Sequence, residues 1–151
     1  GHMAARKRTV TKKPMLTREA PITAWKCSFS IQGKRDRDGY GERESNRYLL
    51  LFGTFDDPVG KHFNFEVFLT PSDETPRVER EGEPAIGSLV TLRRRLTFFV
   101  HLSEIEFATI LTLATAERIR SCVLRFEQPI RGRGTAVTWF YARTELPGVK
   151  Y

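Results

Sequence analysis

The sequence predicts a β-rich α+β protein with about six antiparallel strands and one helix. Most of the chain consists of short segments in which apolar and polar residues alternate, as expected for strands with one buried face. Only residues 103–116 combine a helix-starting signal with apolar residues spaced three and four positions apart. We therefore expect the strands to form a curled sheet or a partly open barrel, against which the single helix packs.

The length and composition are those of one folded domain. A chain of 151 residues with 40% hydrophobic residues and 11 Phe can build a core of ordinary size. We assign residues 1–20 to a disordered basic arm that begins with a cloning remnant, residues 21–146 to one β-rich domain, and residues 147–151 to a short tail.

The net charge of +7 is distributed unevenly along the chain. Residues 1–20 carry a net charge of +5, residues 21–87 a net charge of −3, and residues 88–151 a net charge of +5. A basic arm therefore precedes an acidic front half and a basic back half. This asymmetry favours a partner that is itself charged, or a second copy of the chain that offers the opposite charge.

Three strands are predicted in the front half, at Thr23–Ile31, Asn46–Phe55 and Lys61–Thr70. In the first of them Trp25, Cys27 and Phe29 share one face, which we expect to be half-buried. The second is apolar on both faces, so we expect it to lie inside the sheet with both faces covered.

The stretch Ser88–Ala116 predicts a long strand that leads directly into the helix. Leu96, Phe98 and Val100 fall on one face of the strand together with Val90 and Leu92, and this face should meet the core. An arginine interrupts the alternation within residues 93–95, so we expect a bulge or a bend there.

The helix has a strong start signal. Ser103 is a favourable N-cap, and Glu106 stands at the position that completes a capping box. After the helix, Arg118–Glu127 and Thr135–Glu145 predict a final hairpin, with Val137, Trp139 and Tyr141 on one side of its second strand.

From Asn46 onward, the predicted order is three strands, a helix and two strands. This order resembles that of an OB-fold barrel, in which the helix lies between the third and fourth strands. The resemblance implies that the loop of the last hairpin, residues 128–134, contacts single-stranded nucleic acid. The strand Thr23–Ile31 is then an addition to that fold, and an open antiparallel sheet curled around one helix fits the sequence equally well.

Residues for catalysis or metal binding are sparse. His62 and His101 have no second His, Cys or acid at metal-ligand spacing, so no metal and no cofactor is predicted. Cys27 and Cys122 both fall on apolar strand faces, which favours two buried free thiols in a cytoplasmic protein over a disulfide. A nucleophilic pair of Cys122 and His101 is the less favoured interpretation, and with it a small hydrolase.

The most informative signal is the placement of arginine among aromatic residues. Arginine binds phosphate bidentately and stacks on bases, and exposed aromatic rings stack on unpaired bases. The sequence therefore predicts a non-enzymatic domain that contacts single-stranded or structured nucleic acid through an arginine-rich face and the basic arm. The predicted site consists of Arg93, Arg95, Phe99, His101, Arg118, Arg120, Arg131 and Arg133.

Two alternatives remain at this stage. The arginines can instead pair with the acidic front half, in which case they serve only the fold. The opposite charges of the two halves also suit a protein-interaction module or a self-associating one. No apolar run is long enough to span a bilayer, so no membrane partner is predicted.

Overall fold

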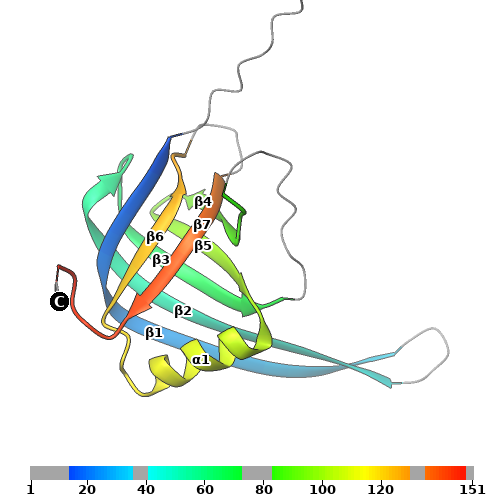
Figure 1. The fold of residues 1–151 in the computed structure, drawn as a ribbon. Coiled ribbons are helices and arrows are strands. Elements are labelled where there is room, and N and C mark those ends of the chain that lie inside the picture. Colours follow the sequence, from blue (N-terminus) through cyan, green and yellow to red (C-terminus); the bar gives the residue numbers. More distant parts are fainter. Residues whose placement is uncertain (1–13, 36–40, 73–82, 130–134, 149–151) are drawn as a thin grey trace, which may run out of the picture.

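The computed structural model describes residues 14–35, 41–72, 83–129 and 135–148. These residues form seven strands and one helix, so the β-rich class with a single helix is confirmed (Figure 1). The elements are β1 (Met15–Arg35), β2 (Gly41–Val59), β3 (His62–Pro71), β4 (Gly87–Leu92), β5 (Arg95–Leu102), α1 (Glu104–Thr115), β6 (Ser121–Glu127) and β7 (Thr135–Arg143).

The seven strands close into an uneven barrel in the order β1-β2-β3-β5-β4-β7-β6, with β6 returning to β1. Every pairing is antiparallel as expected, except that β3 and β5 are parallel. A parallel pair needs a crossover. Here the chain leaves β3 at Pro71 and passes through β4 before it enters β5 in the same direction as β3.

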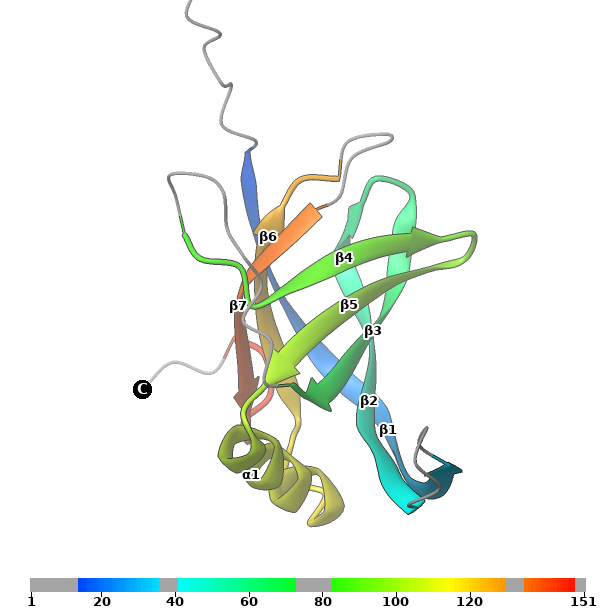
Figure 2. The ribbon, with the colours of Figure 1, turned by 90° about the vertical axis from the view of Figure 1, so that its right-hand side faces the viewer.

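The core lies inside the barrel and is built from the inward faces of all seven strands. Phe55 stacks on Phe65 with ring centroids 4.2 Å apart, and Phe98 meets Phe126 edge-on at 5.0 Å. All four rings are almost completely buried, and burial of one such ring contributes about 2–3 kcal/mol. The helix closes one end of the barrel with Phe107, Ile110 and Ala114, which join the same core (Figures 1 and 2).

The predicted helix and its capping box are confirmed. The Ser103 hydroxyl accepts a hydrogen bond from the backbone N–H of Glu106 at 3.2 Å. The carboxylate of Glu106 in turn accepts one from the backbone N–H of Ser103 at 2.7 Å. Both bonds satisfy N–H groups that have no partner within the helix, which fixes its start at residue 104.

The first strand begins earlier than predicted. Residues 15–20 were assigned to the disordered arm, but they form the first part of β1 and pair with β6, from Met15 opposite Glu127 to Ala20 opposite Cys122. The prediction is wrong here because small and charged residues hide the pattern: Ala20 is fully buried and Arg18 forms an ion pair with Asp57. Residues 1–13 lie outside the described part of the chain.

The predicted long strand before the helix is two strands. The chain reverses at residues 93–94, so β4 and β5 form a hairpin in which Leu89 pairs with Phe98. The reversal changes which alternate residues face inward. Leu89 is buried in β4, whereas Val90 and Leu92, predicted to meet the core, are exposed. The expected bend is therefore a complete turn.

The second half of β1 projects from the barrel with β2 (Figure 1). The pairing of β1 with β6 ends at Pro21, and the pairing of β2 with β3 ends at Leu49. Beyond these points, residues 25–35 and 41–48 pair only with each other among the described residues; we call them the ribbon. The predicted burial of this strand is wrong: Phe29 is 62% exposed, and Cys27 is exposed too, because the helix covers only the barrel end.

The last strand also changes face along its length. The β6–β7 register shifts so that Phe126 pairs with Val137 while Arg125 pairs with Trp139, which makes Thr138 an extra residue. Val137 therefore points into the core, but Trp139 and Tyr141 lie exposed on the outside. The expectation that these three residues share one side fails at this bulge.

Candidate functional site

The structure places four of the predicted site residues along β5 and its preceding turn, and two more beside the end of α1. Arg93 lies in the β4–β5 turn, and Arg95, Phe99 and His101 follow it along β5. Figure 2 shows β5 running from this turn to α1. Its eight residues span about 25 Å at the rise of an extended strand.

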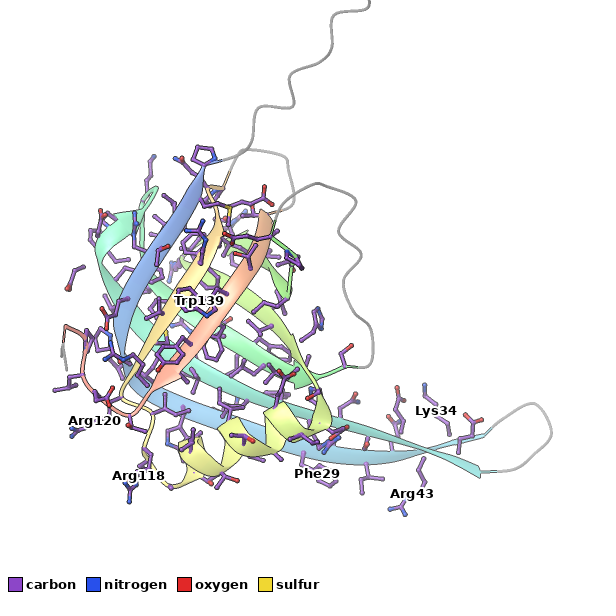
Figure 3. All side chains as sticks on the ribbon, in the orientation of Figure 1. Phe29, Lys34, Arg43, Arg118, Arg120 and Trp139 are labelled. Carbon is purple, nitrogen blue, oxygen red and sulfur yellow. The ribbon has the colours of Figure 1, made fainter. Side chains whose placement is uncertain are left out.

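The remaining predicted residues lie elsewhere. Arg118 and Arg120 come after α1, so they lie at the other end of β5 from the turn, where Figure 3 places both beside the helix end. Arg131 and Arg133 lie outside the described residues. The predicted residues therefore do not form one surface.

The strand register assembles a row of residues across the outside of the barrel near Phe99. Lys26, Leu50, Phe68 and Phe99 are successive cross-strand partners on β1, β2, β3 and β5. Directly paired residues share a face of the sheet, and the opposite face of these strands is the core. The row is therefore on the outer surface, with each of its apolar residues only partly buried.

Aromatic rings run along this row. The ring of Tyr48 stacks on that of Phe68 with centroids 5.1 Å apart, and Phe68 meets Phe99 at 5.5 Å with a tilt of 55°. Phe52 belongs to the adjacent outward row on β2. We call Tyr48, Phe52, Phe68 and Phe99 the aromatic face. Each of these rings is only partly buried, so part of its surface is accessible to a ligand that stacks on aromatic side chains.

Arg95 and Glu66 form an ion pair at the border of the aromatic face. The guanidinium of Arg95 lies 5.2 Å from the ring centroid of Phe52 and 3.3 Å from a carboxylate oxygen of Glu66. The hydroxyl of Thr97 donates a second hydrogen bond to Glu66 at 2.9 Å. The charge of Arg95 is therefore balanced by Glu66, and its guanidinium is fixed over the ring.

Unbalanced positive charge flanks the aromatic face on two sides. Arg93 and Arg94 are exposed in the β4–β5 turn, and Lys26 is exposed on the opposite side, on β1. None of the three forms an ion pair with any residue in the described part of the chain. Together they give this surface cations at both margins and one neutralised ion pair between them.

Other arginines are occupied by carboxylates. Arg18, Arg47, Arg125 and Arg143 each form an ion pair with an acidic residue. The hydrogen bond from Arg125, followed by that from Thr138, lowers the pKa of Glu83. Arg125 with Glu83, like Arg95 with Glu66, joins the basic back half to the acidic front half within the fold, whereas the other three arginines pair in different combinations.

His101 contributes less than expected. It shares the outer face of β5 with Phe99, but its side chain is partly buried and its Nδ1 atom is buried without a hydrogen-bond partner. Cys122 lies inside the barrel, so the two side chains point to opposite faces of the wall. Burial raises the pKa of the Cys122 thiol to about 12, with a smaller contribution from Glu19. The thiol is therefore protonated at neutral pH and is no nucleophile.

The described residues contain no group of three or more His, Cys, Asp and Glu side chains placed to hold a metal ion. Within the same ranges, no helix has the length and apolar character that crossing a membrane requires.

The sequence prediction does not include five members of this surface: Lys26, Arg94, Tyr48, Phe52 and Phe68. The available signal was the strand at residues 46–55, whose apolar residues occupy both faces. It was interpreted as a strand covered on both sides, whereas the described residues cover only its inner face.

Comparison with known proteins gives no relative: no family model matches the chain, and no curated protein or solved structure matches it. The function proposed below is therefore supported by the geometry of the described residues.

Proposed function

We propose that the protein is a non-enzymatic domain that binds single-stranded nucleic acid across the aromatic face. The observation that supports this most directly is the row of partly open rings, from Tyr48 through Phe68 to Phe99, with cations at both margins. Each base that stacks on an aromatic side chain contributes about 1–3 kcal/mol. In this proposal Arg93 and Arg94 contact the phosphates that flank the stacked bases.

Single strands suit this surface better than a duplex. The flat faces of bases are available for stacking only where the bases are unpaired. The aromatic face lies on the slightly curved outside of β2, β3 and β5, and no described element projects there as a helix that could enter a major groove. The chemistry therefore favours a mode of binding in which cations follow the phosphate backbone and rings stack on bases, without recognition of the base sequence.

The strand order supports the same surface. Around the barrel, β1, β2, β3, β5 and β4 follow one another with β3 parallel to β5, which is the order of an OB barrel. In that fold the face of strands 2 and 3 and the loops 1–2 and 4–5 bind oligonucleotides. The corresponding parts here are the aromatic face and the turn with Arg93 and Arg94. Two departures are clear: α1 follows β5, and β6 and β7 lie between β4 and β1.

The test is fluorescence anisotropy with a labelled oligothymidylate over a range of salt concentrations. Replacing both rings, Phe68→Leu with Phe99→Leu, keeps the apolar volume and should weaken binding about tenfold or more through lost stacking. Arg93→Gln with Arg94→Gln should reduce the slope of log affinity against log salt by about 1.4, or 0.7 per lost phosphate contact.

A matched control separates this surface from general electrostatic attraction. Arg118→Gln with Arg120→Gln removes the same charge at the other end of the barrel and should leave affinity almost unchanged. Equal weakening by both arginine pairs would contradict the proposed surface. So would the absence of binding at low salt, or the complete loss of binding on deletion of residues 1–13 alone.

A further inference from the structure

The ribbon leaves one edge of β1 without a neighbouring strand. The last contact on this edge is the hydrogen bond from the N–H of Ile22 to the carbonyl of Arg120, at 2.9 Å. Between Thr23 and Arg35, no described residue pairs with this edge, and Figure 1 shows β1 and β2 projecting from the barrel with no third strand beside them. Unpaired backbone N–H and C=O groups on such an edge are a template for another strand.

The usual protection against pairing is weak on this edge. Proteins block free edges with proline, with frequent charges, or with bulges. The segment from Thr23 to Ile31 contains no proline and only one charged residue, Lys26, and its irregularity in register comes at the start, between Ile22 and Ala24. The side chains of Trp25, Phe29 and Ile31 are 37%, 62% and 49% exposed on one face of the same segment.

We infer that β1 of a second copy of this chain pairs antiparallel with this edge, about a two-fold axis at Phe29. The two ribbons then form one four-stranded sheet with β1 strands at its centre and β2 strands outside. This pairing does not depend on nucleic-acid binding, because it uses backbone groups of β1, whereas the proposed stacking uses the rings of the aromatic face.

The length of the edge supports the second copy as occupant. Phe29 is the midpoint of the free edge from Thr23 to Arg35, so a two-fold axis there pairs the whole edge with no overhang. Antiparallel pairing along that length forms about twelve backbone hydrogen bonds. A typical protein interface has about ten direct hydrogen bonds, so the free edge alone is long enough.

The side chains support the same register. With the axis at Phe29, Trp25 of each copy lies opposite Gly33 of the other, where the space around the glycine is open. An aromatic ring across from an edge glycine is a favourable pair in sheets. Lys26 then lies opposite Gln32, whereas moving the axis to Ser30 would set Lys26 against Lys34, and like charges in direct opposition are unfavourable.

The first experiment measures molar mass by light scattering across a concentration series under reducing conditions. The wild-type protein should shift from monomer to dimer as its concentration rises. Phe29→Lys places two like charges together at the axis and should move the midpoint to about tenfold higher concentration or more. Because Phe29 is mostly exposed, circular dichroism should show an unchanged fold.

A matched control tests whether any exposed aromatic ring would promote non-specific association. Trp139 is also an exposed aromatic residue, 50% exposed on β7, and Figure 3 shows it on the barrel wall, far from the end of the ribbon. Trp139→Lys should leave the midpoint unchanged. A protein that is monomeric at every concentration, or one that loses its dimer through Trp139→Lys but not through Phe29→Lys, would overturn the inference.

A cysteine experiment tests the register. In a Cys27→Ser background, Phe29→Cys should form an intermolecular disulfide on mild oxidation, because the two introduced thiols lie directly opposite. The wild-type Cys27 lies opposite Ile31 of the second copy and should cross-link much more slowly. Faster cross-linking through Cys27 than through the residue-29 thiol would contradict the axis at Phe29.

Discussion

The two halves of β1 lie in different surroundings, and the half with the weaker sequence pattern is the one that is buried. In the barrel, Leu16 and Ala20 pack against the core with β6 beside them, although the charged Arg18 stands between them. In the ribbon, Trp25, Cys27 and Phe29 occupy alternate positions without interruption, but their face is exposed. Alternation therefore determines which residues share a face, and the neighbouring elements determine whether that face is buried.

The difference should be measurable, because the barrel and the ribbon each contain a glycine, a branched aliphatic residue and a cysteine on a strand. Substitution at the barrel position should reduce the free energy of unfolding, and the same change in the ribbon should have little effect. The three pairs that follow are ordered by the size of the expected difference.

The glycine pair should give the largest difference. A Cβ atom at Gly87 would lie 1.7 Å from the carbonyl oxygen of Phe99, so Gly87→Ala must push β4 away from β5. We expect a loss of about 4 kcal/mol or more. At Gly33 a Cβ atom meets nothing within 4 Å, and Gly33→Ala should change stability by less than about 1 kcal/mol. Urea unfolding followed by circular dichroism measures both, and similar losses would contradict the comparison.

The aliphatic pair should give the second largest difference. Leu124 is fully buried in the core, and Leu124→Ala should cost about 2–5 kcal/mol through lost contacts and an unfilled cavity. Ile31 is 49% exposed on the ribbon, so Ile31→Ala should cost less than about 1 kcal/mol. The measurement is urea unfolding at low protein concentration. A large loss for Ile31→Ala there would show that the ribbon face is covered within one copy.

The cysteine pair should give the smallest difference, visible only at alkaline pH. The pKa of Cys122 is raised to about 12 in the folded protein, mainly by burial, while the unfolded thiol ionises near pH 8.5–9. The contribution of this thiol to the free energy of unfolding is fully present below about pH 8.5. It decreases as pH rises towards 12, because the unfolded thiol ionises first, and the loss is about 1–2 kcal/mol at pH 10.

Urea midpoints between pH 7 and pH 10 test this dependence. Cys122→Ala should flatten the alkaline decrease in stability, and Cys27→Ala should leave it as in the wild-type protein. An unchanged slope in Cys122→Ala would show that other groups cause the decrease.

The parts of the fold that the sequence predicts correctly have local causes. The capping box of Ser103 and Glu106 lies within four residues, so the helix start could be predicted from neighbouring positions alone. The prediction that Cys122 lies buried on an apolar strand face is likewise confirmed. In both cases the information needed is contained within one element.

The parts that were not predicted depend on contacts between elements. The β4–β5 turn at Arg93 and Arg94 contains no glycine, asparagine or proline, so it lacks the usual turn signal. The bulge at Thr138 follows from the pairing of β7 with β6, and no residue in β7 predicts it. The ribbon is exposed because β6 and α1 do not extend along it. The sequence of β1 alone carries no information about how far those elements reach.

In the candidate site, too, the residues that the sequence predicts are close together in the chain, and the residues that it misses depend on contacts between strands. The sequence singled out Arg93, Arg95 and Phe99, which are neighbours on one strand and one turn. Tyr48, Phe52 and Phe68 join them only through the registers of β2 and β3 and through the parallel contact with β5. A surface that crosses four strands cannot be read from any single strand, even when each contributes a recognisable aromatic residue.

The contact between β1 and β6 has a consequence for how the protein is made. Met15 pairs with Glu127, so the barrel half of β1 finds its partner β6 only late in the chain, whereas the ribbon half pairs with the next strand, β2. Translation delivers about 5–20 residues per second, and β1 therefore waits several seconds at the ribosome with its whole edge open. Contacts this distant in sequence also slow folding. A chain that stops before β6 would keep that edge open permanently, so early termination should yield aggregates rather than a smaller folded domain.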